Sequence, residues 1–365
     1  MVKSKTIYNY LFYISYFLIV CYSYLGQIDM FKNPLSIISK VSLLLLFLSF
    51  ILQIKKYSKN EIIISSFLII CSFANIFFAK DFTFFKIILI ILCLKDVDLN
   101  KLIKYDFIFR IIILFIIFSS LNLGFCKDEL FYDVDIVKHS LGFRNPNILG
   151  MYSFLMCLEF IYLNWKKMNI LKYSIMFIFI LVLNKYIMCK TSLIMFFLSV
   201  IIKILFDFNK KIFDYKFVKK IICNSYVIFF VLTIIFWSLY YFNFPIGNSI
   251  NQILSNRLFN ISYHFFNSKV SLFGSTLDDI LTLDSFYIYS LLSFGIINFI
   301  ILFILIKKMF NESFASNDRS LIYVFLLLAF YGFSERLLFS ADYNAFICFL
   351  SLALFKKIKR GEEND

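Results

Sequence analysis

Long apolar runs separated by short polar segments dominate the chain, and their lengths predict helices that cross a bilayer. We place twelve such runs, at 6–25, 35–54, 61–79, 82–94, 105–123, 147–164, 172–188, 191–206, 221–242, 284–306, 320–338 and 343–356. Several approach the roughly 20 residues that a straight transmembrane helix needs. Because hydrocarbon offers the backbone no hydrogen-bonding partners, such a segment is expected to be helical. We therefore expect an all-α, polytopic integral membrane protein with about 12 transmembrane helices, forming a single membrane domain over residues 1–365.

Composition agrees with this pattern and excludes several classes of site. The chain is 61% hydrophobic and 16% charged, whereas a soluble domain is about 45–50% apolar and about 25% charged. The eight cysteines stand singly, without a CxxC pair, and the chain has two histidines. We read the cysteines as small apolar residues in helices, and we expect neither a metal site nor a cofactor.

The distribution of Lys and Arg predicts the orientation. If the N-terminus is cytoplasmic, most of the 37 Lys and Arg residues fall in inner segments, as the positive-inside rule requires. Both termini are then cytoplasmic. The net charge of +14 largely reflects this topology, so it gives no argument for nucleic-acid binding.

Two outer segments, 124–147 and 243–283, are longer than the other outer connections. Both contain aromatic and aliphatic residues throughout, which argues against disorder. In the second segment, residues from Ile250 to Phe266 show helical spacing, so we expect a helix that lies along the outer membrane surface. Long connections of this kind are often functional.

The first long segment ends in a polar stretch, KHSLGFRNPNILG at 138–150. It carries the cations Lys138 and Arg144 beside a helix entrance formed by Asn145 and Asn147. We take Asn147 as the candidate N-cap of that helix. A capped helix start with adjacent cations can also bind an anion.

Lys190 and Arg257 are outer cations that each have two interpretations. Lys190 precedes Thr191 and Ser192 at an expected helix start, where backbone N–H groups favour an anion; it could equally contact lipid headgroups. Arg257 could extend toward headgroups from an interfacial helix. Alternatively, its planar guanidinium could hold a pyrophosphate by paired hydrogen bonds.

Two carboxylates stand near the outer ends of apolar runs. Asp284 opens the run 284–306 and is either a helix N-cap or first-turn acid, or a group that orients or deprotonates a sugar hydroxyl. Glu335 lies beside Arg336 near the outer end of the run 320–338. A carboxylate at that depth is a functional candidate, although an ion pair with a neighbouring helix would also explain it.

The other polar residues receive structural interpretations. We expect Arg110 to extend from its span toward the inner surface, His139 to form structural hydrogen bonds, His264 to lie on the surface, and Asp278 and Asp279 to be solvated.

The order of four short motifs resembles bacterial Wzy-type polysaccharide polymerases, which make O-antigen and capsule chains. SLGFRNPNILG is similar to the family's GFxxPN-x-xG motif, and CKTS at 189–192 stands where the family often has Ser-Arg-Thr. ERLLFSADYNAF resembles the last-span pattern with its Glu and Asn. The second-loop signature is an Arg, an LFG, and an Asp that opens a helix with a Tyr and a later Gly. The corresponding residues here are Arg257, Leu272-Phe273-Gly274, Asp284, Tyr287 and Gly295, with Glu335 and Asn344 in the last pattern.

The chain also departs from the family pattern. Arg144 and Asn145 stand where many capsule polymerases have Gly-His, so any duty of that His is missing here. Lys190 replaces an Arg, which keeps the charge but loses the bidentate fork. Asp284 stands near the position at which related ligases carry His, which favours a polymerase.

The resemblance covers about half the chain, from Ser140 to the end, and it implies a GT-C-like glycosyltransferase in the bacterial cytoplasmic membrane. Its donor would be a growing glycan on undecaprenyl diphosphate, and its acceptor a sugar hydroxyl of a new lipid-linked repeat unit. The reaction would be metal-independent and inverting, with a chain-length regulator and a flippase as possible partners. Arg257, Asp284 and Glu335 would be catalytic. The expected substrate-binding residues are Lys138, Arg144, Asn145, Asn147, Lys190, Tyr287, Arg336 and Asn344.

Other classes remain open at this point. A ligase would use the same cations to attach finished glycan to another acceptor. A flippase or other transporter would be a non-enzyme, but its cations should line a central cavity, whereas these cluster on outer loops. A structural membrane protein would leave the ordered motifs unexplained.

Overall fold

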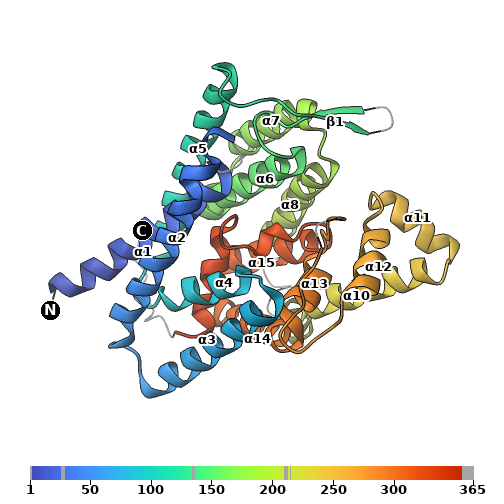
Figure 1. Cartoon of the computed structure of the whole chain (residues 1–365). Coiled ribbons are helices and arrows are strands. Elements are labelled where there is room, and N and C mark those ends of the chain that lie inside the picture. The colour runs from blue at the N-terminus through green and yellow to red at the C-terminus, as the bar shows by residue number, and fades with distance from the viewer. Residues whose placement is uncertain are drawn as a thin grey trace. The chain divides into compact units, whose positions relative to one another are not determined.

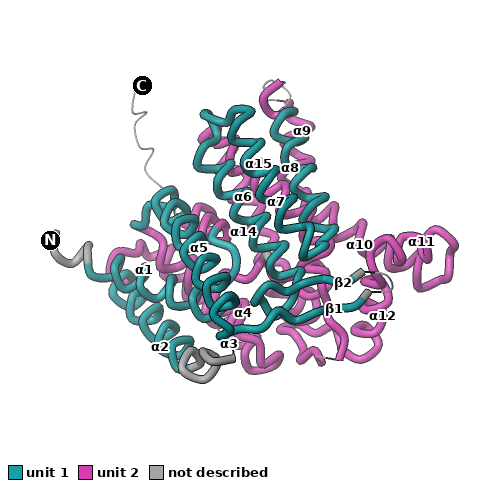
Figure 2. The backbone as a smooth tube through the Cα atoms, turned by 90° about the horizontal axis from the view of Figure 1, so that it is seen from above, with its two compact units in different colours: residues 1–53, 96–205, 342–345 teal, residues 54–95, 206–341, 346–365 magenta. Residues whose placement is uncertain are grey.

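The computed structural model describes residues 2–25, 29–133, 136–208, 213, 215–278 and 280–355 of the 365-residue chain. The protein is mostly helical and divides into two compact units that each combine separate stretches of sequence (Figure 2). Unit 1 comprises residues 1–53, 96–205 and 342–345, and unit 2 comprises residues 54–95, 206–341 and 346–365.

Unit 1 contains six α-helices and a two-stranded hairpin among its described residues, and two of these helices run one to three residues past its boundary. Its elements are α1 (Val2–Leu25), α2 (Asp29–Ile54), α5 (Leu99–Asn122), β1 (Leu130–Asp133), β2 (Ile136–His139), α6 (Pro146–Leu163), a 3₁₀ turn (Trp165–Lys167), α7 (Ile170–Ile187) and α8 (Lys190–Phe208).

Unit 2 holds the remaining helices. They are α3 (Lys59–Ala79), α4 (Thr83–Leu92), α9 (Lys216–Cys223), α10 (Ser225–Tyr241), α11 (Pro245–Ile253), α12 (Arg257–Asn267), α13 (Phe286–Tyr289), the π-helix η3 (Ser290–Phe294), α14 (Gly295–Ala315), α15 (Arg319–Tyr331) and the 3₁₀ segments η4 (Leu337–Phe339) and η5 (Ala345–Ala353). In Figure 1, α11 and α12 fold back along α10.

The protein has several helices that are long and apolar enough to cross a membrane. Within the described residues there are six, and a seventh if α9 and α10, bent by 59° at Asn224, form one span. The six are Ile37–Ile54, Lys59–Ala79, Pro146–Leu163, Ile170–Ile187, Lys190–Phe208 and Phe286–Ala315. These helices confirm that the protein is a mostly helical membrane protein. Residues 356–365, whose Lys and Arg residues were used to predict the orientation, lie outside the described residues.

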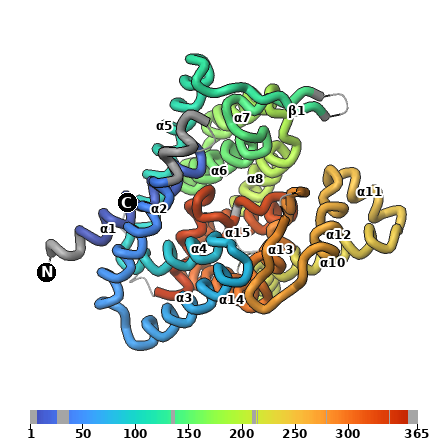
Figure 3. The backbone as a smooth tube through the Cα atoms, in the orientation of Figure 1, coloured from blue at the N-terminus to red at the C-terminus, as the bar shows by residue number. Residues whose placement is uncertain are grey.

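Several expected elements differ in detail. The segment 124–147 contains the antiparallel strands β1 and β2, which lie between α5 and α6 along the chain (Figure 3). The surface helix expected from Ile250 to Phe266 is broken into α11 and α12 at residues 254–256, where Ser255 and Asn256 adopt positive φ. The expected run 320–338 ends as a helix at Tyr331, and the last run forms 3₁₀ helix instead of α-helix.

A broken helix is the central feature of unit 2. The span 286–315 is interrupted by the π-helix η3 and by Gly295, whose φ of +80° interrupts regular helical geometry. The extended segment 271–275 crosses this break: Ser275 N donates to Leu292 O (2.9 Å) and Ile296 N to Ser271 O (3.0 Å). These bonds satisfy backbone groups that the break exposes, which a buried segment requires.

Two glycines and one asparagine make the crossing possible. A Cβ on Gly274 would lie 1.9 Å from Ser293 O, and one on Gly295 would lie 2.1 Å from Gly274 N. From α3, Nδ2 of the buried Asn75 donates to Phe273 O (2.8 Å) and to Ser293 O (2.7 Å). The LFG motif at 272–274 and Gly295 are therefore adjacent in the structure. Glycine is needed at both positions, because a Cβ would prevent the two backbones from approaching so closely.

Candidate functional site

Side chains of α12 hydrogen-bond to the chain segment that leads into α13. Asn260 Nδ2 donates to Thr282 O (3.0 Å), and His264 Nε2 donates to Leu281 O (2.8 Å). His264 is only 1% exposed, so the expectation that it lies on the surface is wrong. The face of α12 that carries it packs on residues 281–284, and Asp278 accepts a hydrogen bond from the Tyr263 hydroxyl of the same helix (2.9 Å). Asp279 lies outside the described residues.

This packing places Asp284 against the first residue of α12. Arg257 Nε donates to Asp284 Oδ2 over 3.4 Å. Helix α13 begins at Phe286 with Ser285 before it and no side-chain cap, so the N-cap interpretation of Asp284 is wrong. Burial raises the pKa of Asp284, and the charges of Arg257 and Arg336 only partly oppose this effect.

Two guanidinium groups in this cluster keep donors available. Within the described part of the chain, neither terminal Nη atom of Arg257 has a hydrogen-bonding partner, although the side chain is about nine-tenths buried. The Arg336 guanidinium lies over the Tyr289 ring, 4.9 Å from its centroid, and it donates no hydrogen bond to any described residue. Both cations act electrostatically on Asp284. Open donors of this kind suit an anion with several oxygens.

Glu335 is the buried acid of the cluster. It is 7% exposed and follows the end of α15 at Tyr331, so it lies beyond that helix and not within it as expected. Burial and the nearby charge of Asp284 raise its pKa to about 8, against the opposing effect of Arg257 and Arg336. Glu335 is therefore mostly protonated at neutral pH. Two arginines thus face two acids whose pKa values are both raised, which favours a net positive charge on the cluster.

Asp81 fixes the broken helix next to Arg336, and sequence reasoning missed it. Its Oδ2 accepts from the hydroxyls of Tyr289 (2.6 Å) and Ser293 (2.5 Å), and its Oδ1 from Thr83 N (2.8 Å). Burial alone would raise the pKa of Asp81, but these hydrogen bonds lower it overall. A single acid in the short connection between two apolar runs was the available signal. Through Tyr289, Asp81 orients the ring on which Arg336 rests.

Tyr287, expected to contact substrate, has a packing role in the structure. It is fully buried, and its hydroxyl donates to Ala329 O (2.6 Å), which ties α13 to α15.

In unit 1, the polar stretch 138–150 forms a defined helix start. Asn145, not Asn147, is the N-cap: its Oδ1 accepts from Asn147 N (2.8 Å), and Pro146 takes the first helical position. Pro146 is favoured there because it lacks an N–H that needs a partner. Arg144 precedes this cap, and Lys138 lies on β2 opposite Phe131.

His139 has the structural role that we expected. Its Nδ1 lies 2.5 Å from Asp128 Oδ2, and Asp128 also accepts from Leu141 N (2.8 Å). These contacts fix the turn that leads from the hairpin toward α6.

Lys190 is the first residue of α8, as expected, after a turn in which Met188 has a φ of 45°. A Cβ on Gly150 would lie 2.6 Å from Cys189 Sγ and 2.9 Å from Ser192 Oγ. The glycine that ends the 138–150 stretch thus lets α6 pack closely on the start of α8. All eight cysteines are free thiols.

A buried charge cluster in unit 1 was missed. Arg110 is fully buried, so the expectation that it extends to the inner surface is wrong; its Nε lies 2.6 Å from Asp106 Oδ2 and 3.0 Å from Glu159 Oε1. Its Nη1 donates to the Tyr24 hydroxyl (2.8 Å) and its Nη2 to Tyr343 O (2.6 Å). The neighbouring Asn344 is also fully buried.

Unit 2 therefore brings together four of the expected residues, Arg257, Asp284, Glu335 and Arg336. The expected residues in unit 1 are Lys138, Arg144, Asn145, Asn147, Lys190 and Asn344. Among the described residues, no three His, Cys, Asp or Glu side chains gather where they could hold a metal ion.

No protein-family model, curated protein or solved structure matches the chain.

Proposed function

We propose that the protein is a membrane glycosyltransferase that polymerises undecaprenyl-diphosphate-linked oligosaccharide repeat units into surface polysaccharide. The observation that carries the proposal is the cluster in unit 2, where the open guanidinium donors of Arg257 and Arg336 lie with the partly buried Asp284 and the buried Glu335. The ordered motifs that resemble Wzy-type polymerases support the same assignment, since the resemblance selects Arg257, Asp284 and Glu335.

In the proposed reaction, a sugar hydroxyl of a new lipid-linked unit attacks the anomeric carbon of the growing chain. A glycosidic C–O bond forms, the C–O bond to undecaprenyl diphosphate breaks, and the lipid diphosphate leaves with the electron pair. In-line attack inverts the anomeric centre. The leaving group gains negative charge in the transition state, so preorganised cations accelerate its departure. Arg257 and Arg336 fill that role, and we propose that no metal ion is required.

The proton of the attacking hydroxyl goes to the ionised form of Glu335, which is the minor form at neutral pH and becomes more populated as the pH approaches 8. A general base works best when its pKa is near the operating pH, and the pKa of Glu335, raised to about 8, meets that condition. Asp284 accepts from Arg257 Nε and leaves the Nη donors free, so we assign it as the residue that positions Arg257. The expected substrate-binding residues of unit 1 remain predictions.

The proposal also includes the membrane, the orientation and the number of spans. We place the chain in the bacterial cytoplasmic membrane with both termini cytoplasmic, about twelve spans and a GT-C-like arrangement, acting on the outer face. Possible partners are a chain-length regulator and a flippase.

A ligase that transfers finished glycan to another acceptor is the second candidate, because it would use the same two arginines. A flippase or other transporter is the third.

The experiment is the size distribution of surface polysaccharide in cells that lack the gene and carry wild type, Arg257→Ala or Arg257→Lys. Arg319→Ala is the matched control, since Arg319 is an arginine of the same unit at the opposite end of α15. Membrane levels of each variant are measured by immunoblot. We expect Arg257→Ala to reduce the long ladder to a single exported repeat unit, Arg257→Lys to retain a small part of it, and Arg319→Ala to leave it intact.

The same gels separate the three candidates. Full-length chains that stay unattached in Arg257→Ala cells would indicate a ligase, and repeat units retained inside the cell would indicate a flippase. A normal ladder in the deletion strain would refute all three.

A further inference from the structure

An apolar groove runs between α10 and α14 in unit 2, away from the charged cluster. It has a volume of about 330 Å³ and is lined mainly by Val227, Phe230, Phe299, Ile300, Phe303 and Ile304. The rings of Phe299 and Phe303 are tilted by 40° with their centroids 4.2 Å apart, and the ring of Phe230 meets that of Phe299 edge-on with centroids 4.9 Å apart. The aliphatic residues on the rim are about half exposed, including Val227 at 45% and Ile304 at 48%.

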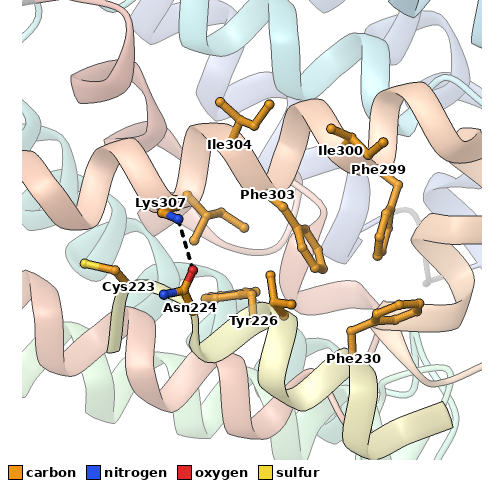
Figure 4. A pocket seen from close by; sticks show the side chains of 11 residues that line it. Cys223, Asn224, Tyr226, Phe230, Phe299, Ile300, Phe303, Ile304 and Lys307 are labelled. Atoms are coloured by element: carbon orange, nitrogen blue, oxygen red, sulfur yellow. Dashed lines mark hydrogen bonds between the residues drawn. The ribbon is translucent and has the colours of Figure 1, made fainter. Parts of the chain in front are cut away.

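One end of the groove is cationic. Figure 4 shows Lys307 and Asn224 at this end, where Lys307 Nζ donates to Asn224 Oδ1 (3.1 Å), and the phenylalanines at the other. Lys219 of α9 lies beyond this end and outside the lining: its ammonium lies 5.6 Å from the Phe314 ring centroid, and Lys219 and Lys307 both act electrostatically on the thiol of Cys223, which lines the groove. The groove thus joins an apolar trough to two lysines.

The cationic end is far from the proposed catalytic cluster. Tyr289, on whose ring Arg336 rests, precedes Gly295 at the start of α14. Lys307 lies twelve residues after Gly295 along this helix, which corresponds to about 18 Å. A diphosphate held by Arg257 and Arg336 therefore does not also reach Lys307. By the positive-inside argument, Lys307 and Lys219 belong to the inner ends of their spans.

We propose that this groove is a binding site for an anionic phospholipid of the cytoplasmic leaflet. One acyl chain lies along Val227, Phe303 and Ile304, and the phosphate contacts the ammonium groups of Lys307 and Lys219. The trough from Phe299 to Lys307 is about 12 Å long, which accommodates the upper part of an acyl chain. Charge complementarity selects an anionic headgroup, because juxtamembrane lysines attract anionic lipids and not zwitterionic ones.

The test is native mass spectrometry of the purified full-length protein, titrated with dioleoyl phosphatidylglycerol or dioleoyl phosphatidylcholine. The variants are Lys219→Gln/Lys307→Gln, which removes the charge, and Val227→Trp, which fills the groove from its exposed rim. Lys308→Gln is the matched control, because Lys308 is equally exposed on the next position of the same helix.

We expect wild type and Lys308→Gln to retain phosphatidylglycerol and the double lysine variant to bind it about tenfold more weakly. Val227→Trp should lose the lipid with both lysines in place, which shows that the acyl chain is needed. Equal retention of both lipids, equal binding by all variants, or displacement of the lipid by inorganic phosphate would overturn the proposal. Preferential retention of undecaprenyl phosphate would also overturn it, by assigning the groove to a polyprenyl chain.

Discussion

Replacing Glu335 by Gln should make the protein more stable at alkaline pH while removing the polymerase activity that we propose for it. The carboxyl is buried, and its pKa is raised to about 8 from an ordinary value of 4.5. Below about pH 4.5, both the folded and the unfolded chain hold this proton, so the group costs nothing. As the pH rises from there, the unfolded chain releases the proton first, and folding stability falls until the folded group also ionises near pH 8.

The magnitude follows from the separation of the two pKa values. At about 1.4 kcal/mol for each pH unit, the loss between pH 4.5 and pH 8 amounts to roughly 5 kcal/mol. Glutamine has the shape of the protonated acid and does not titrate, so Glu335→Gln should lose this pH dependence. We expect the variant and wild type to be similar near pH 5 and the variant to be more stable by several kcal/mol near pH 9.

The assay is thermal unfolding of purified wild type, Glu335→Gln and Glu312→Gln in detergent from pH 5 to pH 9. Glu312 is an exposed glutamate of α14, and its variant should follow wild type throughout. Parallel profiles for wild type and Glu335→Gln would refute the reasoning, because they would mean that the buried carboxyl does not hold its proton more tightly when folded. Polymerisation by Glu335→Gln should fall sharply at every pH, because glutamine cannot accept the proton of the attacking hydroxyl. A substitution that stabilises a protein and removes its activity is typical of an active-site residue.

Three further predictions concern the scaffold. Gly274→Ala should destabilise the protein by several kcal/mol in denaturant titrations, because the new Cβ would lie 1.9 Å from Ser293 O. The control is Gly124→Ala, which is also at positive φ but has no atom within 4 Å of the new Cβ, so it should cost only about 1–2 kcal/mol. Arg110→Met should cost roughly 3–5 kcal/mol in the same titration, because it leaves two buried carboxylates without a cation; an unchanged midpoint would show that the ion pairs contribute nothing. Asp81→Asn should lower stability by roughly 2 kcal/mol, because two hydroxyl donors lose a charged acceptor; polymerisation should weaken with it as the Tyr289 ring under Arg336 loses its anchor, and unchanged polymerisation would exclude this positioning role.

Local chemistry was readable from the sequence wherever neighbouring residues decide the outcome. The helix start near Pro146 was expected, yet the cap was placed on Asn147 instead of Asn145, a choice that depends on one backbone conformation. The break between α11 and α12 was missed, because the helical spacing of apolar residues continues through Ser255 and Asn256. Asn251 explains why the break is stable: its Oδ1 accepts from Leu258 N (3.0 Å) and Phe259 N (3.2 Å) and so caps α12 from the preceding helix.

Arg110 shows where sequence reasoning fails. An arginine near the end of an apolar run ordinarily extends to the membrane surface, and the residues next to Arg110 in the sequence favour that interpretation. Its partner Glu159 is 49 positions away on another helix, and only packing shows that the three charges meet without solvent.

The sequence by itself determined the class of the protein, because twenty-residue apolar runs have few ways to satisfy their backbones other than as membrane helices. It also singled out Asp284, Glu335 and Arg336, because charged residues near the ends of such runs are costly to retain. Arg257 was selected by its place on the expected surface helix and by the family resemblance. Only the tertiary structure decided that these four share one cluster, that Glu335 holds its proton near neutral pH, and that Asp81 supports the broken helix beside them. Burial, open hydrogen-bond donors and backbone crossings depend on segments distant in the chain, and no local pattern records them.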